Sequence, residues 1–305
     1  MTTTIAPTIG TNTARSFDDK WTQNPRLAFD ETLREGSEVQ QWILNRNGFA
    51  SPAAMRSYLA DRARILDAGC GNGRVTALLQ RLAPSTSQLT GIDLVAADVA
   101  CDNLAALPNV VVAPANLLGD LTQFGEFDFV YCQEVLHHTG DARGAFRNLS
   151  QRLSPNGEIA IYVYRKKAAI REFTDDYVRD RIASMPYAQA RAVSAEIAEL
   201  GRALSATRVN GQPVTVNVPS VEMLGIEAGE YDLQRFVYHF FMKCFWNANL
   251  SHDENVAINY DWYHPQDATR HDLTEVLAWF EEAHLGVVHT HVDPYGITVR
   301  GRRAA

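Results

Sequence analysis

The hydrophobic pattern between residues 64 and 164 alternates between two kinds of segment. Short apolar runs suited to buried strands recur, and amphipathic segments of helical period separate them. This alternation predicts a parallel β-sheet with crossover helices, and strands such as EIAIYVY are apolar on both faces because helices cover both sides of such a sheet. The predicted strands are 64–68, 88–92, 109–113, 127–132 and 158–164, and the predicted helices are 74–83, 95–106 and 141–153.

The C-terminal part of the chain adds a helix and two strands. An amphipathic helix with a capping signal is predicted for 272–283. Strands at 286–292 and 296–301 follow it, joined by the turn residues 293–295. The short connection predicts an antiparallel hairpin at the edge of the sheet.

The alternation stops between residues 165 and 270, which predicts an insertion. Its segments 170–205 and 232–247 are predicted to be helical. The second segment is rich in aromatic residues, which either form a lid over a ligand or pack in the interior of the insertion. Residues 236–246 are also a candidate contact in a homodimer. The predicted organisation has four parts: an N-terminal tail and helical cap (1–60), a core (61–164), an inserted helical lid (165–270), and a last helix with the strand hairpin (271–305).

The N-terminal region contains no recognisable membrane or export signal. Residues 1–15 lack the basic and apolar regions of a secretory signal and are predicted to be a disordered tail, whereas 17–60 are predicted to be helical. No apolar run approaches the roughly 18–20 residues that cross a bilayer. We therefore expect no membrane partner.

Composition narrows the class of protein. The 305 residues are 46% hydrophobic and 21% charged, enough for a full core, and the net charge of −8 disfavours nucleic acid as a partner. A small molecule is the expected partner. The four cysteines are scattered without metal-type spacing, which suits reduced thiols in a cytoplasmic protein. His289 and His291 alternate on one strand but lack a third ligand, so no metal site is expected.

The segment RILDAGCGNGR (64–74) carries the strongest chemical signal. Glycines at 69, 71 and 73 follow a strand and open a helix, so backbone N–H groups can approach a ligand closely. A dinucleotide-binding loop would need a third glycine where Arg74 stands. Asp67 would repel a pyrophosphate but suits a cationic ligand without phosphate. S-adenosyl-L-methionine fits that description.

Several segments together resemble the class I S-adenosylmethionine-dependent methyltransferase family of small-molecule type. They are LDAGCGNG (66–73), Gly91-Ile92-Asp93, FDFVYC (127–132), EVLHH (134–138) and LSPNGE (153–158). The resemblance implies an α/β, Rossmann-like, seven-stranded, mostly parallel sheet with an antiparallel last strand and helices on both faces. It also implies S-adenosyl-L-methionine as cofactor and S-adenosyl-L-homocysteine as product.

The resemblance also implies a cofactor site. Gly69, Gly71 and Gly73 would line the methionine part, with Asp67 near its amino group. Asp93 would accept hydrogen bonds from the ribose hydroxyls. Leu94 would lie against the adenine, and Asn116 stands where the family usually has an acid near the adenine amine. The remaining predicted cofactor residues are Cys70, Leu117, Cys132 and Gln133.

Methyl transfer is an in-line displacement, so positioning of the acceptor supplies much of the rate. A base is needed when the acceptor is a hydroxyl or a protonated amine. His138, and after it His137, are the candidate bases because histidine titrates near neutral pH. The predicted substrate-binding residues are Glu134, Tyr164, Arg165, His239, Tyr263 and His264.

The sequence thus predicts a methyltransferase that acts on O, N or C of a small molecule. Three alternatives remain open at this point: a methyltransferase for protein or RNA, a cofactor-binding regulatory protein without turnover, and a nicotinamide-dependent oxidoreductase. A basic groove would favour RNA, and the acidic balance of the chain speaks against it.

Overall fold

A computed structural model of the chain describes residues 11–304. The predicted disordered tail therefore lies mostly outside the described residues. Residues 11–15 belong to helix α1 (Thr11–Gln23), so that part of the prediction is wrong. The chain divides into two compact units: unit 1 combines residues 1–165 with 269–305, and unit 2 is residues 166–268.

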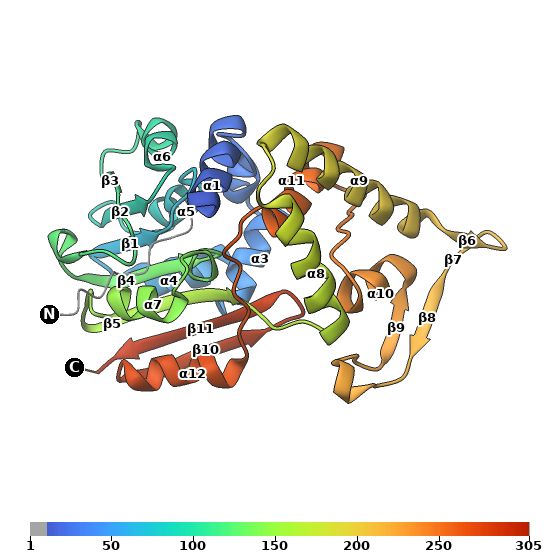
Figure 1. Cartoon of the computed structure of the whole chain (residues 1–305). Coiled ribbons are helices and arrows are strands. Elements are labelled where there is room, and N and C mark those ends of the chain that lie inside the picture. Colours follow the sequence, from blue (N-terminus) through green and yellow to red (C-terminus); the bar gives the residue numbers. More distant parts are fainter. Residues whose placement is uncertain (1–10, 305) are drawn as a thin grey trace, which may run out of the picture. The chain divides into compact units, whose positions relative to one another are not determined.

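A seven-stranded sheet forms the centre of unit 1 (Figure 1). The strand order is β10-β11-β5-β4-β1-β2-β3, in which β11 is antiparallel to both neighbours and the other strands are parallel to one another. The predicted sheet with an antiparallel last strand is confirmed. The strands are β1 (Arg64–Ala68), β2 (Gln88–Asp93), β3 (Val110–Pro114), β4 (Phe127–Gln133), β5 (Leu153–Tyr164), β10 (Leu285–Val292) and β11 (Gly296–Arg303).

Strand β5 begins earlier than predicted, because the turn signal 154–157 lies inside it. Leu153 pairs with Phe127 of β4, and the next registered pair joins Glu158 to Phe129. The extra residues form an irregularity in which Asn156 adopts a φ of 64°. A bulge of this kind keeps the strand in the sheet while it absorbs residues that favour turns.

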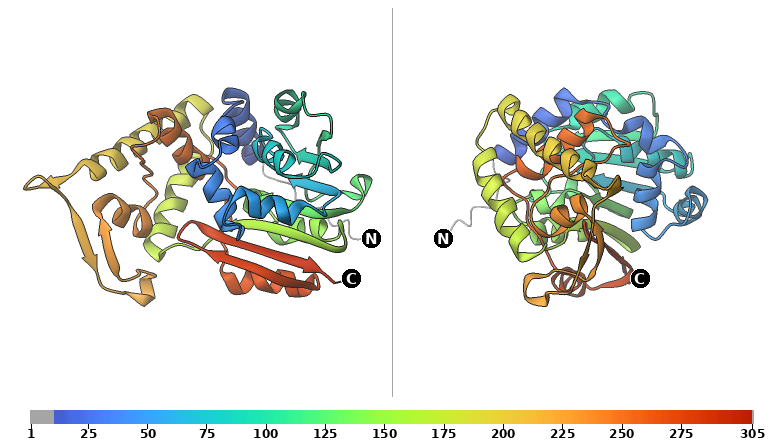
Figure 2. Two further views of the ribbon diagram at one scale, coloured as in Figure 1. Left: turned by 180° about the vertical axis from the view of Figure 1, so that it is seen from behind. Right: turned by 90° about the vertical axis from the view of Figure 1, so that its right-hand side faces the viewer.

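Helices cover both faces of the sheet, because successive side chains of a strand point to opposite sides. Val130 and Cys132 of β4 pack with α7 and α12, whereas Phe129 and Tyr131 pack with α3, α4 and α5. Figure 1 shows α12 along β10 and β11, and the view from behind in Figure 2 shows the blue helices of 29–59 on the opposite face. The helices are α2 (Phe29–Leu33), α3 (Glu38–Arg46), α4 (Pro52–Leu59), α5 (Arg74–Leu82), α6 (Ala97–Leu104), α7 (Ala142–Ser150) and α12 (Leu273–Glu282), with short 3₁₀ turns η1 (Thr122–Phe124) and η2 (Leu136–His138).

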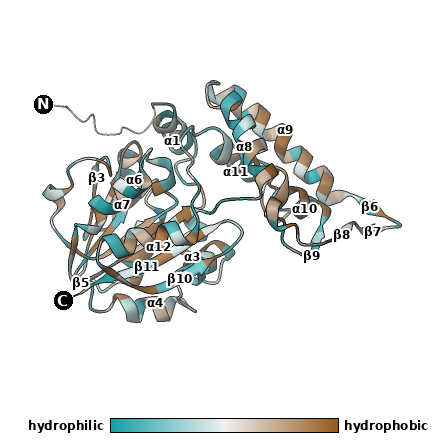
Figure 3. Ribbon diagram, turned by 60° about the horizontal axis from the view of Figure 1, so that its bottom comes forward, coloured by the Kyte–Doolittle hydropathy of each residue, from teal (hydrophilic) through white to brown (hydrophobic). Residues whose placement is uncertain are grey.

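Unit 2 is built from four helices and two small β-ribbons over its described residues. Two helices occupy the segment 170–205, with Pro186 between them. Figure 3 shows α9 with hydrophobic and hydrophilic residues in alternating stripes, as expected for a helix buried along one side. The elements are α8 (Ala169–Ile182), α9 (Tyr187–Ala206), β6 (Arg208–Val209), β7 (Gln212–Pro213), β8 (Thr215–Val218), η3 (Glu222–Leu224), β9 (Gly229–Asp232), α10 (Leu233–Phe240) and α11 (His252–Tyr263).

The helix predicted for 232–247 is correct only in its first half, because α10 ends at Phe240. Beyond it the backbone is bound by side chains from α11. Phe245 N–H donates to Asn259 Oδ1 at 2.9 Å, and Asn259 Nδ2 donates back to Phe245 O at 3.1 Å. These hydrogen bonds to Asn259 take the place of backbone hydrogen bonds within a helix. Sequence periodicity cannot reveal a partner that lies in another helix.

Helix α11 was not predicted. Its buried residues lie on all sides of the helix rather than along one stripe, so no amphipathic period marks it. A capping box between Ser251 and Glu254 starts the helix and was the available local signal. Across residues 11–304, no helix combines the length and apolarity that crossing a membrane requires.

Glu158 of β5 connects the sheet to helix α4 and to the neighbouring strand β11. Its carboxylate is 1% exposed, accepts the Tyr58 hydroxyl of α4 at 2.6 Å and accepts Arg302 Nε of β11 at 2.8 Å. Glu158→Gln keeps the volume but removes the charge from these bonds, so we expect the free energy of unfolding to fall by about 1–3 kcal/mol. Urea unfolding measures this change, with the exposed Glu126→Gln as control. Equal stability of Glu158→Gln and wild type would contradict this role.

Candidate functional site

The glycine loop joins β1 to α5 at the carboxyl edge of the sheet. Gly69 and Gly71 have positive φ angles of 78° and 54°. A Cβ atom at Gly69 would lie 2.3 Å from Val135 Cγ2, and one at Gly71 would lie 2.8 Å from Trp21 Cζ2. The loop therefore requires glycine both for its backbone conformation and for the close approach of its neighbours.

Asp93, at the end of β2, holds this loop in place. Its Oδ2 accepts Gly71 N–H at 2.9 Å, and its Oδ1 accepts the N–H groups of Val95 at 3.0 Å and Ala96 at 2.9 Å. A carboxylate has about four acceptor positions. About one position of Asp93 thus remains for a ligand.

Asp67 is a buried acid at the end of β1. Its side chain is 3% exposed, and its Oδ2 accepts the Thr76 hydroxyl at 2.6 Å. Burial raises the pKa of Asp67 to about 7; the hydrogen bond from Thr76 opposes this shift and the charge of Asp93 adds to it. The carboxyl group is therefore close to half ionised at neutral pH, and a nearby cation would favour its ionised form.

Glu134 follows β4 and lies between two guanidinium groups. Its φ angle is 66°, a conformation that costs energy in a residue with a side chain. Its Oε1 is 3.4 Å from Arg46 Nη1, and its Oε2 is 3.6 Å from Arg74 Nη2. Burial opposes ionisation of Glu134, but Arg46 and Arg74 outweigh it and lower the pKa of the carboxyl. The two ion pairs hold the strained residue in position.

Arg46 is fixed at the end of α3 although it is charged. The residue is 2% exposed. Its guanidinium carbon lies 3.7 Å from the ring centre of Trp42 and 4.8 Å from that of Tyr162, and its Nη2 lies 3.4 Å from the Tyr131 hydroxyl. Its Nε is buried and finds no hydrogen-bond acceptor within residues 11–304. The aromatic neighbours orient this cation without neutralising it.

A cavity within unit 1 brings many of the predicted residues together. The predicted residues in its lining are Asp67, Gly69, Cys70, Gly71, Asp93, Leu94, Asn116, Leu117, Gln133, Glu134 and His138. Gly73 and Cys132 are outside the lining: Gly73 packs on Leu104, and Cys132 is buried in the core. Most of the predicted cofactor residues thus lie together at the carboxyl ends of β1, β2, β3 and β4.

Three of the lining residues have distinct local settings. Leu94 is 38% exposed, which leaves an apolar surface open at the cavity. Asn116 Oδ1 accepts Leu118 N–H at 2.9 Å and so closes its own turn. Gln133 Oε1 accepts Asn47 Nδ2 at 3.1 Å, which ties the end of β4 to the segment after α3.

The two predicted bases are placed differently. His138 is 5% exposed and lines the cavity, with the ring of Phe17 at 4.8 Å and that of Tyr164 at 5.4 Å, both edge-on. His137 is fully buried and stacks on Tyr164 at 3.6 Å. His137, Tyr164 and Arg165 are not part of the lining. Of the two predicted bases only His138 lines the cavity, and its role as a base stays a prediction.

Sequence reasoning missed the cavity residues of helices α1 and α3, and Arg74 at the start of α5. Phe17, Lys20 and Trp21 of α1 line the cavity, as do Arg46 and Arg74. The spacing of Phe17 and Trp21 by four residues was the only local signal, since it places both rings on one side of a helix. No motif marks the cations, because their positions depend on how the helices pack on the sheet.

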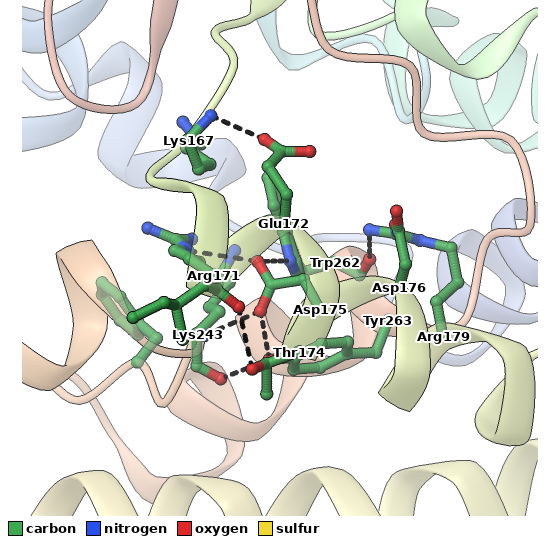
Figure 4. A network of polar contacts seen from close by, with 12 residues as sticks. Lys167, Arg171, Glu172, Thr174, Asp175, Asp176, Arg179, Lys243, Trp262 and Tyr263 are labelled. Atoms are coloured by element: carbon green, nitrogen blue, oxygen red, sulfur yellow. Dashed lines mark hydrogen bonds and ion pairs between the residues drawn. The ribbon is translucent and has the colours of Figure 1, made fainter. Parts of the chain in front are cut away.

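The remaining predicted substrate residues lie in unit 2. Tyr263 is buried and its hydroxyl donates to Asp175 Oδ1 at 2.8 Å (Figure 4). His264 is fully buried, with Nδ1 2.7 Å from the Tyr260 hydroxyl. His239 is partly exposed on α10. Tyr263 and His264 thus have structural partners inside unit 2.

The histidine pair of β10 has a structural contact. His289 Nε2 lies 3.0 Å from Arg46 O and so connects β10 to α3. Burial lowers the pKa of His289, which keeps the ring neutral in this contact. Within the described part of the chain, no group of three or more His, Cys, Asp or Glu side chains is placed to hold a metal ion.

Sequence comparisons place a known domain over the cavity-forming segment. Residues 66–161 match the model of a family described as a methyltransferase domain. The ubiquinone biosynthesis O-methyltransferase of Xanthomonas oryzae is 32% identical over 111 residues, which are 35% of this chain and 45% of that protein. An uncharacterised protein of Synechococcus is 36% identical over 122 residues, 37% of this chain and 29% of its own. The chain spans less than half the length of these curated relatives.

Solved structures extend the similarity to the whole fold. A chain in the complex of the Trm112 methyltransferase activator and a putative methyltransferase from Haloferax volcanii has a TM-score of 0.50 and 12% identity. The alignment covers 95% of this chain and 98% of that one. At this level of identity the similarity concerns the fold alone.

The buried carboxyl of Asp67 predicts a pH dependence of stability. Between pH about 4 and about 7 the native chain holds a proton that the unfolded chain has released, so this group makes stability fall as pH rises through that window. Asp67→Asn cannot ionise and loses this contribution. Urea titrations give the unfolding free energy of Asp67→Asn minus that of wild type. We expect this difference to be more positive at pH 8 than at pH 5. The exposed Asp61→Asn is the control, and an unchanged difference between the two pH values would contradict the assignment.

Proposed function

We propose that this chain, whose residues 66–161 are a class I S-adenosylmethionine-dependent methyltransferase domain, transfers a methyl group to an O, N or C atom of a small-molecule acceptor. The observation that carries the proposal is the pair of carboxylates beside the glycine loop. Asp67 and Asp93 end the adjacent strands β1 and β2, and both line the cavity. Their negative charge opposes a diphosphate and favours a sulfonium and an ammonium group.

The charges of the cavity fit the different parts of S-adenosylmethionine. We assign the amino group of the donor to Asp67, its carboxylate to Arg46 and Arg74, and a ribose hydroxyl to the open acceptor position of Asp93. The unpartnered Nε of Arg46 supports the carboxylate assignment, because a bound carboxylate would satisfy a buried donor. The exposed side chain of Leu94 offers an apolar contact to the adenine. Asn116 is the candidate partner for the adenine amine.

S-adenosylmethionine supplies a methyl group on a positively charged sulfur, and the new bond to the acceptor atom forms as the carbon–sulfur bond breaks. The chain's contribution is to hold the acceptor atom in line with that bond. His138 lies at the cavity wall, where we assign it to take the proton of a hydroxyl or ammonium acceptor. An activated carbon acceptor needs positioning alone. S-adenosylhomocysteine is the product in each case.

The lining of the cavity favours a small acceptor. Phe17 and Trp21 of α1 add aromatic side chains to the lining, and aromatic walls exclude water from a reacting cation. The net charge of −8 disfavours RNA as acceptor.

The ribose assignment is tested with Asp93→Asn. The substitution keeps an acceptor for the backbone N–H groups but removes the charge, so we expect the binding free energy of S-adenosylhomocysteine to weaken by about 1–3 kcal/mol. Isothermal titration calorimetry measures the affinity. Asp98→Asn, an exposed acid on α6, is the matched control and is expected to bind as wild type does. Undiminished affinity in Asp93→Asn would refute the assignment.

The role of His138 is tested with His138→Ala. We expect turnover with a hydroxyl or amine acceptor to fall by about 10²–10⁴-fold, the usual contribution of a general base, while affinity for S-adenosylhomocysteine stays within about twofold. Product formation over a panel of acceptors gives the rate, and calorimetry gives the affinity. His252→Ala, at an exposed site in unit 2, is the control. Wild-type turnover in His138→Ala would dismiss the base.

A further inference from the structure

Residues 269–271, which we call the return segment, belong to unit 1 and lead into α12. Two of their backbone N–H groups bind carbonyls beside the candidate base. Thr269 N–H donates to His137 O at 2.9 Å, and His271 N–H donates to Tyr164 O at 2.8 Å. His137 lies in η2, which follows β4, and Tyr164 is the last residue of β5. The return segment therefore contacts unit 1 at the carboxyl ends of two strands.

The peptide group that joins His137 to His138 is bound on both of its sides. Its carbonyl belongs to His137, accepts Thr269 N–H and also lies 3.3 Å from the Thr269 hydroxyl. Its N–H belongs to His138 and donates to Val135 O at 2.8 Å. Because a trans peptide is planar and its two polar groups point in opposite directions, these bonds fix its orientation. The side chain of His138 starts from the Cα atom attached to this plane.

Tyr164 provides a second connection between the return segment and His138. Its carbonyl is bound by His271 N–H, and its ring contacts the ring of His138 edge-on at 5.4 Å and stacks on that of His137 at 3.6 Å. The return segment thus acts on His138 through the backbone before it and through a ring beside it.

The side chain of His271 ties the return segment to α12. Its Nδ1 lies 2.8 Å from Glu275 Oε1, and its Nε2 lies 2.9 Å from the Thr269 hydroxyl. A carboxylate only accepts hydrogen bonds, so Nδ1 is the donor to Glu275. The imidazole is 7% exposed and meets the ring of Trp279, a core residue of unit 1, edge-on at 4.8 Å. A chain of contacts therefore runs from the core through His271 to Thr269.

A role in stability alone does not account for this chain of contacts. The start of α12 is capped without His271, because Asp272 Oδ1 accepts Glu275 N–H at 2.9 Å. Thr269 is exposed, so burial of its side chain contributes little to the core. The hydroxyl instead lies between the imidazole of His271 and the carbonyl next to His138.

We propose that Thr269 and His271 are positioning residues for His138, and that Glu275 orients His271. None of the three lines the cavity, so they act through the peptide group of His137 and the ring of Tyr164. This inference rests on the proposed function, in which His138 takes the proton of the acceptor, and extends it to residues outside the cavity.

The test records the imidazole signals of the full chain, labelled with ¹⁵N-histidine, by nuclear magnetic resonance. The signal that is missing from His138→Ala belongs to His138. Thr269→Val removes the hydroxyl but keeps the shape of the side chain, and His271→Phe keeps a ring against Trp279. Thr269→Ser restores the hydroxyl. Thr274→Val, at an exposed site on α12, is the matched control.

We expect the His138 signal to move in Thr269→Val and His271→Phe, and to keep its wild-type position in Thr269→Ser and Thr274→Val. Turnover over the acceptor panel is expected to fall in the first two variants by up to about 10²-fold, the cost of misplacing a reacting group by about 1 Å. An unmoved His138 signal in both variants would overturn the inference. A signal that moves equally in Thr269→Ser would overturn it too, because the hydroxyl would then not be the cause.

Calorimetry with S-adenosylhomocysteine separates this inference from the proposed function. An absence of binding to wild type removes the proposed function, while the His138 signal still decides whether the return segment holds that ring. Binding, together with wild-type turnover in Thr269→Val and His271→Phe, keeps the proposed function and removes the inference. A melting temperature well below that of Thr274→Val indicates a loss of fold in a variant, and the comparison with Thr269→Ser then decides.

Discussion

Three backbone N–H groups converge on the carboxylate of Asp93, and the shape of the cavity depends on that convergence. One comes from Gly71 in the glycine loop, and two come from the chain that leads into α6. The loop is also bound to β2 through Ile92 O, which accepts the N–H groups of Gly69 and Cys70. Asp93 therefore holds the glycine loop and the start of α6, and the same three hydrogen bonds fix its own carboxylate. A ligand that contacts Asp93 meets a surface that is already organised, so little ordering is needed on binding.

The charges around the cavity are arranged so that each acid has a distinct environment. Burial and the neighbouring charge of Asp93 raise the pKa of Asp67 against the hydrogen bond from Thr76, whereas Glu134 lies between Arg46 and Arg74, which lower its pKa. Groups of the same chemical type thus differ in charge at neutral pH. The proposed donor site uses Asp67 for the amino end of the ligand and Arg46 and Arg74 for its carboxylate end, a match that a uniformly acidic or basic cavity would not offer.

Unit 2 uses a buried carboxylate in a similar way. Asp175 accepts bonds from three separate segments, including the backbone of Lys243, and thereby fixes the irregular chain after α10. Such a centre favours one arrangement, because loss of Arg171 would leave a buried charge unbalanced and loss of another donor would leave the buried carboxylate short of a hydrogen bond.

The sequence by itself determined the strands, their crossover helices, the glycine loop and the acids beside it, because these follow from local periodicity and from residues close together in the chain. The tertiary structure alone decided that Arg46 meets Glu134, that helix α11 is buried on all sides, and that the chain after Phe240 leaves the helix to bind α11. Each of these depends on partners far away in sequence. Side chains from distant segments satisfy charges and backbone groups there, and no local pattern encodes which partner arrives.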